Sequence, residues 1–509
     1  MADAWSKEPM IQRTEITEAD ASTTDRLSTG VPGIDEILHG GLVPYRSYLV
    51  RGQPGTGKTI LGLHYLAAGT ENGETALFVN LEGTTADIER DAAAFGFDLD
   101  EVHFLDLSPK SDFFADDQSY EGFESSAVES DPLTERITDG ITSLGPDRVF
   151  VDPLTQLRYL STDEYQFRKQ ALSFMRLLSE QEATVLFTTQ DMETTPDDDL
   201  QFMSDGIFEL NCQSTGRTIS VPKFRGSDVR RGQHALRITD VGLRVYPELR
   251  PGDHRAEFVA EALSSDIPEM DELLDGGIER GTISVISGPT GVGKTTTGTQ
   301  FMKEATGRGE RSVIYLFEES ESTFLTRSEA VNIPVERMLD QQMLRVEEIE
   351  PLECSPQEFA HRVRTDVEEN GTNIVMIDGI AGYRLSLRGD DEGLVPYLHA
   401  LCRYLKNVGV TVMLIDEIET ITGEFQATEG TISYLADNLV FLRHLELHGE
   451  MRKVIGVLKK RTSDFERTLR EFKITEHGIT AGDPLTGLQG ILSGTPQLAD
   501  WDPPSQEND

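Results

Sequence analysis

The apolar positions of the chain fall into short continuous runs, separated by longer stretches in which apolar residues recur at helical spacing. Runs such as YLV, ALFVNL, RVFVD and TVLFTT are rich in β-branched or aromatic residues and predict strands buried on both faces. Stretches such as KTILGLHYLAAGT and YQFRKQALSFMRLLSEQ predict amphipathic helices between them. Alternating strands and helices of this kind predict an α/β fold with a mainly parallel sheet flanked by helices.

The same order of motifs occurs twice along the chain. Asp35 corresponds to Asp271, and Lys58 corresponds to Lys294, so that both pairs are 236 residues apart. A repeated unit of roughly 230 residues has the length of a domain rather than of a solenoid repeat. We therefore expect five parts: a polar N-terminal tail at 1–27, a first domain at 28–250, a linker at 251–255, a second domain at 256–485, and a C-terminal segment with its tail at 486–509.

Each unit contains one match to the phosphate-binding pattern G-x-x-x-x-G-K-[ST], directly after a predicted strand and before a predicted helix. Glycines let backbone N–H groups surround phosphates, the lysine reaches the β- and γ-phosphates, and the hydroxyl coordinates Mg²⁺. A single match could be a chance glycine-rich turn, but two matches in register predict two sites for ATP and Mg²⁺. The candidate nucleotide-binding residues are Gly55, Thr56, Gly57, Lys58 and Thr59, and Gly291, Val292, Gly293, Lys294 and Thr295.

Carboxylates at strand ends are the candidates for metal binding. Asp152 and Asp378 end the apolar runs RVFVD and NIVMID. Together with the hydroxyls of Thr59 and Thr295, they are predicted to hold the Mg²⁺ shell. The alternative interpretation is an aspartate that caps the turn after its strand.

Glutamates follow another strand of each unit. Glu82 comes after LFVNL, and Glu318 and Glu319 come after VIYLF. A carboxylate that faces the γ-phosphate can orient and deprotonate an attacking water or hydroxyl, and Glu318 is also a candidate metal ligand. In so acidic a chain, the alternative is a solvated acid at a strand end.

A basic pair ends a predicted strand in the later half of each unit. Lys223 and Arg225, and likewise Lys459 and Arg461, are separated by one residue, so their side chains project to the same side of the strand. They could reach the γ-phosphate of a neighbouring subunit, as an arginine finger does. The alternative is an exposed basic pair without a partner of this kind.

The formal net charge of −43 arises from 89 acidic and 46 basic residues spread along the whole chain. This distribution indicates a solvated acidic surface, similar to that of proteins from extreme halophiles, and disfavours nucleic acid as a partner. The N-terminal residues show no apolar run of a signal peptide, and no apolar stretch reaches the length of a membrane span. Three widely separated cysteines fit a reducing compartment, so we expect a cytoplasmic protein without a membrane anchor.

From about residue 28 to 495, the chain resembles the KaiC-type tandem ATPases of the RecA superfamily. The resemblance rests on GIDEILHGG, both phosphate-binding loops, FEES, IDG, HGEMRKVIGVLKKR, LREFKITEHGI and ILSGTPQ. It implies two tandem RecA-like domains in an ATP-dependent homohexamer, with ATP between neighbouring subunits, ATP hydrolysis, and Ser/Thr autokinase activity in the second domain. It also implies protein regulators and a role in timing or signalling.

The resemblance assigns roles to residues and exposes two departures. Glu318 and Glu319 match the paired catalytic glutamates of the second domain, whereas in the first domain only Glu82 is present and Gly83 replaces the second glutamate. The family's adjacent phosphorylatable Ser and Thr align with Ser433 and Tyr434. Ser433 and the upstream Thr428 are therefore the candidate phosphoacceptors, with capping or packing as the alternative role for Ser433.

Two other functions are compatible with this pattern. The fold also occurs in DNA-handling RecA relatives, such as recombinase paralogues, although the acidic charge argues against DNA. Alternatively, ATP could hold an assembly together while being hydrolysed very little. Gly83 favours this interpretation for the first domain, because it replaces the second glutamate there.

Overall fold

A computed structural model describes residues 26–108, 132–158, 164–190, 197–213, 216–387, 394–418, 430–447, 449–486, 488–489 and 497–498. Contacts between residues divide the chain into two compact units, and the main boundary along the chain lies between Val245 and Tyr246. Each unit has its own sheet and its own core.

The first unit is built around one nine-stranded sheet with the strand order β3-β2-β4-β5-β1-β6-β7-β8-β9. Its elements are α1 (Pro32–Ile37), β1 (Ser47–Gly52), α2 (Lys58–Glu71), β2 (Ala76–Asn80), α3 (Thr85–Ala94), β3 (Val102–Asp106), α5 (Pro132–Leu144), β4 (Arg148–Asp152), η2 (Leu154–Arg158), α6 (Glu164–Glu180), β5 (Thr184–Gln190), α7 (Asp198–Met203), β6 (Gly206–Gln213), β7 (Gly216–Phe224), β8 (His234–Thr239) and β9 (Gly242–Tyr246).

The second unit repeats this order as β14-β13-β15-β16-β12-β17-β18-β19-β20. Its elements are η3 (Pro251–Asp253), β10 (Ala262–Leu263), α8 (Pro268–Leu273), β11 (Ile278–Glu279), β12 (Ile283–Gly288), α9 (Lys294–Gly307), β13 (Arg311–Leu316), α10 (Glu321–Glu329), α11 (Val335–Asp340), β14 (Leu344–Glu348), α12 (Pro356–Glu368), β15 (Thr372–Asp378), α13 (Ile380–Leu385), α14 (Leu394–Asn407), β16 (Thr411–Glu417), η5 (Gly430–Tyr434), β17 (Asn438–Leu447), β18 (Glu450–Lys460), β19 (Arg470–Thr475), β20 (Gly478–Pro484), β21 (Leu488–Gln489) and β22 (Gln497–Leu498).

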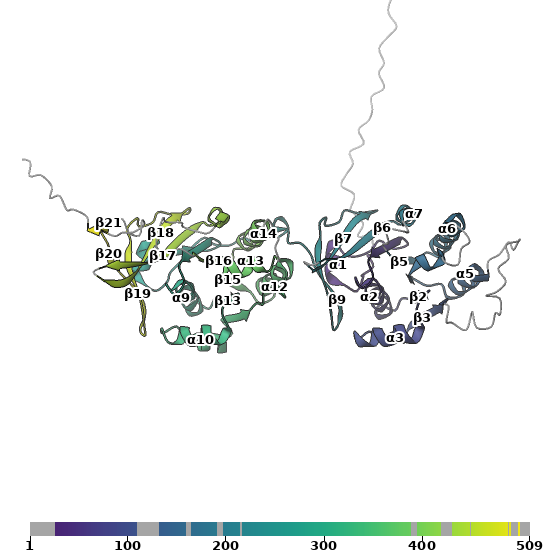
Figure 1. Cartoon of the computed structure of the whole chain (residues 1–509), viewed down its shortest axis with the longest axis horizontal. Helices are drawn as coiled ribbons and strands as arrows, with labels where there is room; N and C mark the ends of the chain where they lie inside the picture. The colour runs from purple at the N-terminus through teal and green to yellow at the C-terminus, as the bar shows by residue number, and fades with distance from the viewer. Residues whose placement is uncertain are drawn as a thin grey trace, which may run out of the picture. The chain divides into compact units, whose positions relative to one another are not determined.

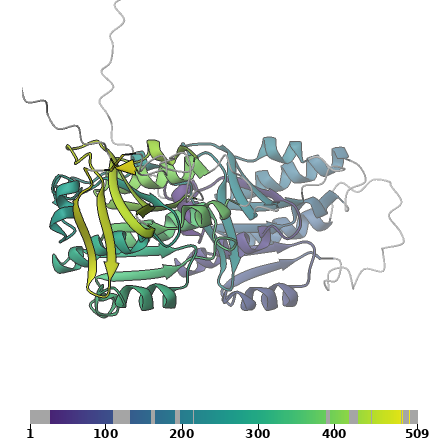
Figure 2. The ribbon, with the colours of Figure 1, turned by 60° about the vertical axis from the view of Figure 1, so that its left-hand side comes forward.

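Both sheets are mainly parallel. In the first sheet, the neighbouring strands β3, β2, β4, β5, β1 and β6 pair in parallel. In the second sheet, the neighbouring strands β14, β13, β15, β16, β12 and β17 do the same. An antiparallel extension follows in the second unit, where β17, β18, β19 and β20 pair in sequence. Figure 2 shows β18 to β20 as the yellow-green strands at the edge of that sheet. The predicted α/β fold with two mainly parallel sheets is confirmed.

Alternate residues of the central strands enter the cores on opposite faces of each sheet. In β4, Phe150 packs with α1, α2 and α3, whereas Val149 and Val151 pack with α5, α6 and α7. In the second unit, α8 to α11 cover one face and α12 to α14 cover the other. Figure 1 shows these helices along the two sheets. Burial on both faces explains why the strands appear in the sequence as continuous apolar runs.

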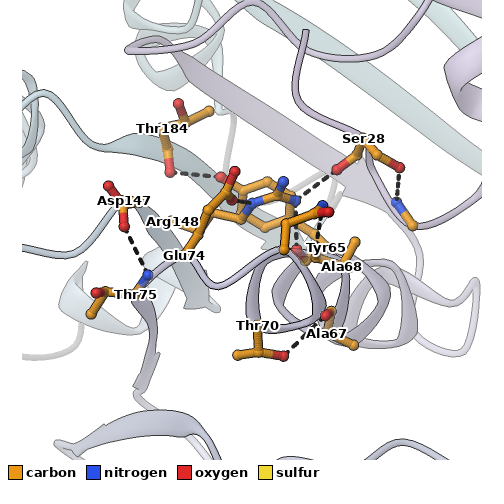
Figure 3. Close-up of polar contacts among 12 residues, drawn as sticks. Ser28, Tyr65, Ala67, Ala68, Thr70, Glu74, Thr75, Asp147, Arg148 and Thr184 are labelled. Atoms are coloured by element: carbon orange, nitrogen blue, oxygen red, sulfur yellow. Dashed lines mark hydrogen bonds and ion pairs between the residues drawn. The ribbon is translucent and has the colours of Figure 1, made fainter. Parts of the chain in front are cut away.

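A buried arginine fixes the helix that follows the first phosphate-binding loop. The guanidinium of Arg148 donates to the carbonyl oxygens of Ser28 at 2.7 Å and Tyr65 at 2.9 Å, and it forms an ion pair with Glu74 (Figure 3). The Tyr65 hydroxyl donates to the carbonyl oxygen of Thr184 at 2.8 Å. These bonds join α2 to the first residues of β4 and β5, so the helix is positioned by polar groups as well as by the core.

Within the described residues, every helix is too short or too polar to cross a membrane.

Candidate functional site

The two phosphate-binding loops adopt the same strand–turn–helix geometry. The first connects Gly52, the last residue of β1, to Lys58, the first residue of α2, and the second connects β12 to α9 in the same way. The residue before each lysine is left-handed, with φ of 106° at Gly57 and 112° at Gly293, a conformation that favours glycine. Backbone N–H groups at the start of a helix form a cradle for phosphate.

Both loop lysines are buried and folded back into their loops. The Lys58 amino group donates to the carbonyl oxygens of Gly52 at 2.8 Å and Gln53 at 3.1 Å. Lys294 makes the two matching bonds at 2.8 and 3.0 Å. Burial lowers the pKa of Lys294, so the site favours an anion that compensates its charge.

A threonine hydroxyl and an aspartate carboxylate meet beside each loop. Thr59 donates to Asp152 at 2.6 Å, and Thr295 donates to Asp378 at 3.2 Å. Burial raises the pKa of both carboxyls, and that of Asp378 reaches about 6. A desolvated carboxylate next to a hydroxyl fits Mg²⁺, because the cation stabilises the ionised form that burial disfavours.

The candidate catalytic glutamates follow strands that are tied to these aspartates. The backbone N–H of Leu81 donates to the carbonyl oxygen of Asp152, and that of Phe317 donates to the carbonyl oxygen of Asp378, both at 3.0 Å. Glu82 and Glu318 are the next residues. Each loop then ends in a helix cap, Thr84 for α3 and Ser320 for α10. The glutamates are thus held between a strand end and a capped helix.

The two glutamates of the second unit have different partners. Glu318 accepts the backbone N–H of Gly382 at 3.1 Å, whereas Glu319 pairs with Arg327 of α10 at 2.7 Å. Desolvation raises the pKa of Glu319, and Arg327 opposes this rise. A carboxyl whose pKa is raised by its surroundings is suited to exchange a proton in acid–base chemistry.

The first unit has a simpler acidic loop. Glu82 is exposed, and its backbone N–H donates to the Asn80 side chain at 3.3 Å. The side-chain amide nitrogen of Asn80 donates to the carbonyl oxygen of Gly83 at 2.5 Å, which closes the loop. The departure at Gly83 thus leaves one glutamate where the second unit has two.

Two further groups next to the loops were missed by the sequence reasoning. Thr188 donates to Asp152, and Glu417 lies 3.5 Å from the amino group of Lys294. Thr188 lies on β5, the neighbour of β1, and Glu417 lies on β16, the neighbour of β12. Glu417 is paired in register with Gly288, where the second loop begins. Comparison of TVLFTTQ with TVMLIDE at the strand ends could have identified these positions.

The basic pair of the second unit lies at the opposite end of the central strand from the phosphate-binding loop. Lys459 is opposite Leu439, which pairs with Val285 near the start of β12. The backbone N–H of Arg461 donates to Asp437, whose own N–H donates to Ile283, the first residue of β12. The loop starts at the other end of this six-residue strand, roughly 16 Å away.

The first unit repeats this arrangement. The backbone N–H of Arg225 donates to Asp205 at 2.9 Å, and that of Asp205 donates to Ser47, the first residue of β1, at 2.7 Å. Lys223 donates to the carbonyl oxygen of Gln201 at 2.7 Å. In both units, the structure therefore brings loop, Thr–Asp pair and glutamates together and sets the basic pair apart from them.

The candidate phosphoacceptor Ser433 lies near the second basic pair. Lys459 donates to the carbonyl oxygen of Ser433 at 2.9 Å, and Arg461 donates to that of Tyr434 at 3.3 Å. Thr428 lies outside the described residues.

Comparison with known proteins matches both units to one family. The family model described as ATPase: KaiC matches residues 27–250 and again 263–485. The circadian clock oscillator protein KaiC of Parasynechococcus marenigrum is 27% identical over 498 residues, which cover 94% of this chain and 95% of that protein. KaiC of Synechococcus elongatus is 27% identical over 92% of both chains, and KaiC of Prochlorococcus marinus is 28% identical over 92% of this chain and 95% of its own.

Proposed function

The chain belongs to the KaiC family of ATPases, and on this premise we propose that each of its two domains binds Mg·ATP and hydrolyses it at an interface between copies of the chain. The observation that carries this proposal is the separation of two groups of residues in each domain. The phosphate-binding loop and the basic pair lie at opposite ends of one central strand. A basic pair so far from its own loop can reach phosphates only outside its own domain, and we assign those phosphates to another copy of the chain.

The loop and metal residues bind the nucleotide. Backbone N–H groups of Gly55 to Thr59 and of Gly291 to Thr295 surround the phosphates. Lys58 and Lys294 leave the carbonyl oxygens that they contact and bind the β- and γ-phosphates. The Thr59–Asp152 and Thr295–Asp378 pairs would hold Mg²⁺, which would neutralise charge that develops on the phosphate oxygens.

In the second domain, Glu318 or Glu319 accepts a proton from the attacking water. Arg327 keeps Glu319 available in its ionised form by opposing the effect of desolvation. Glu318 is oriented by the backbone N–H of Gly382. Lys459 and Arg461 of a neighbouring copy stabilise the negative charge of the transition state.

In the first domain, Glu82 performs this role alone, with Lys223 and Arg225 of a neighbour at the phosphates. Because Gly83 supplies no second carboxylate, we expect slower turnover than in the second domain.

The second domain also transfers the γ-phosphate to a hydroxyl of the chain, as a Ser/Thr autokinase. Support comes from the position of Ser433, whose carbonyl oxygen contacts Lys459 of the basic pair. The family leads us to expect a homohexamer that assembles in the presence of ATP. Such an assembly would place each acceptor hydroxyl next to the nucleotide of a neighbouring copy. The proposed setting is cytoplasmic timing or signalling with protein regulators.

Steady-state ATPase measurements test this function. We expect Lys58→Ala and Lys294→Ala each to remove the turnover of one domain and the double variant to remove all of it, since the loop lysine contacts the transferred phosphate. Lys473→Ala, an exposed lysine of β19, is the matched control. Wild-type protein without turnover, or a double variant with wild-type turnover, contradicts the proposal.

A further inference from the structure

A buried aspartate connects the arginine of the second basic pair to the start of the central strand. Asp437, between η5 and β17, is 2% exposed. Its backbone carbonyl oxygen accepts the backbone N–H of Arg461 at 3.0 Å, and its carboxylate accepts the backbone N–H of Ile283 at 3.1 Å. A guanidinium nitrogen of Arg461 lies 3.7 Å from the same carboxylate. Asp437 therefore contacts both the backbone and the charged group of this arginine.

A lysine of α14 shares the carboxylate of Asp437. The amino group of Lys406 donates to the two carboxylate oxygens at 2.8 and 2.7 Å. Because these distances are shorter than the distance to Arg461, Lys406 supplies most of the opposite charge that a buried carboxylate requires. The side chain of Arg461 is 51% exposed, and its charge is only partly compensated at the longer distance.

The first domain has the aspartate and the arginine, but a serine stands at the position of the lysine. The backbone carbonyl oxygen of Asp205 accepts the backbone N–H of Arg225 at 2.9 Å, and its carboxylate accepts the guanidinium at 3.4 Å. The strands that follow α6 and α14 pair with the central strand in the same register. By this register, Lys406 corresponds to Ser179, an exposed residue of α6. The cation at this position is therefore a feature of the second domain.

We propose that Asp437 and Lys406 are positioning residues for Arg461. Asp437 holds the arginine directly after β18, and Lys406 neutralises the carboxylate, so that the guanidinium can leave it for the phosphates of a neighbouring copy. This inference rests on the proposed function, in which Arg461 stabilises the transition state on another copy. Without Lys406, Arg461 is the remaining cation within 4 Å of the buried carboxylate in the described part of the chain. The arginine would then have to break a closer ion pair before it could act.

ATPase measurements in a Glu82→Gln background, which silences the first domain, test the role of Lys406. Lys406→Met should lower kcat about three- to fivefold, the size expected for the ion pair of a part-exposed lysine. The KM for ATP should change less than about twofold, because the arginine acts in the transition state. Lys406→Arg restores the charge and should keep the kcat of the background. Asp437→Asn removes the charge that captures Arg461, so Lys406→Met should have no further effect in it. Lys473→Met, at an exposed lysine of β19, is the matched control.

Mixtures of two defective chains distinguish positioning of Arg461 from a general effect on the fold. In the same background, a Lys294→Ala chain can supply only its basic pair to a complete site, and an Arg461→Ala chain can supply only its loop. Lys406→Met in the Lys294→Ala chain should lower the recovered activity about three- to fivefold. In the Arg461→Ala chain, the same substitution should leave the recovered activity unchanged. A general loss of stability would lower the activity from either chain.

The outcomes separate this proposal from the proposed function. An unchanged kcat in Lys406→Met overturns the positioning role and leaves the ATPase proposal intact, and equal losses from both chains of the mixture overturn it too. If the Glu82→Gln chain shows no turnover, the proposed function of the second domain fails, and the role of Lys406 fails with it.

A reciprocal change in the first domain decides the matter even where Lys406→Met does not fold. Ser179→Lys, in a Lys294→Ala background, introduces a cation at the position that Lys406 occupies in the second domain. It should raise kcat of the first domain at least about twofold, because Asp205 then competes less for Arg225. An unchanged or lower kcat in this variant rejects the proposal.

Discussion

The amino group of Lys294 lies 3.5 Å from a carboxylate oxygen of Glu417. In the first domain, the position paired in register with the start of the loop is Gln190 instead. At this register position, the proposed second nucleotide site therefore carries a negative charge that the proposed first site does not carry. This charge pairs with the lysine in the nucleotide-free state and repels phosphate, so both effects oppose the binding of ATP in the second domain.

Replacement of Glu417 by Gln should strengthen ATP binding to the second domain. Glu417 is 39% exposed, so the ion pair contributes only up to about 1 kcal/mol, which corresponds to a decrease in Kd of about two- to fivefold. The Kd of the second domain is measured by titration with a fluorescent ATP analogue, in a Lys58→Ala background that prevents binding at the first site. The reciprocal change Gln190→Glu should weaken the first site. Equal Kd values for Glu417→Gln and wild type contradict the account.

Gly83→Glu should accelerate ATP hydrolysis in the first domain. A Cβ at Gly83 would meet no atom within 4 Å, so the position accepts a side chain. The added carboxylate recreates the glutamate pair of the second domain, and we expect turnover to rise at least about twofold. The measurement is ATPase activity in a Lys294→Ala background. Gly252→Glu adds the same charge at another open position and should have no effect.

Asp378→Asn should stabilise the protein when neither nucleotide nor Mg²⁺ is bound. Burial raises the pKa of Asp378 to about 6, so the folded state binds its proton more tightly than the unfolded chain does. Between about pH 4 and pH 6, the free energy of unfolding therefore falls as pH rises, by at most about 3 kcal/mol from this group. The asparagine variant lacks this loss.

Thermal unfolding at two pH values measures this difference. At pH 7.5 the midpoint for Asp378→Asn should exceed that of wild type, and near pH 4 the two should agree. Asp464→Asn, at a position where the side chain is 78% exposed, serves as the control. A variant less stable than wild type at pH 7.5 without ligands rejects the assigned pKa.

Arg327→Ala should move the acidic limb of the pH–rate profile of the second domain to higher pH. Arg327 lowers the pKa of Glu319 against the larger effect of desolvation, and its removal leaves that effect unopposed. The profile of kcat against pH, in a Lys58→Ala background, tests this. Arg337→Ala removes an exposed arginine of α11 and should leave the limb in place. An unchanged limb in Arg327→Ala excludes Glu319 as the titrating base.

The sequence predicts those parts of the fold and site that depend on residues close together in the chain. The loop from Gly288 to Thr295 is a local pattern, and continuous apolar runs predict strands because both sheet faces are buried. Local patterns of this kind do not show which partner a residue meets through strand pairing. Glu417 reaches Lys294 across 123 residues, and Thr188 reaches Asp152 across 36.

For the basic pairs, the sequence predicts the direction of the side chains but not their position in the sheet. The spacing of Lys459 and Arg461 predicts two side chains on one side of a strand. That the strand carries them away from their own loop depends on the antiparallel pairing of β18 with β17. Register across a sheet is set by long-range packing, which a single sequence does not display.

We propose that each second-domain site is completed by another copy of the chain, and mixing two defective variants tests this arrangement. One carries Lys294→Ala, the other carries Lys459→Ala with Arg461→Ala, and both carry Glu82→Gln to silence the first domain. Mixed in the presence of ATP, they should recover ATPase activity that neither has alone, because an intact loop of one variant meets the intact basic pair of the other. A variant that carries all these substitutions, mixed with Lys294→Ala, forms no complete site and should stay inactive. Absence of recovery in mixtures shown by native mass spectrometry to contain both chains would contradict the account.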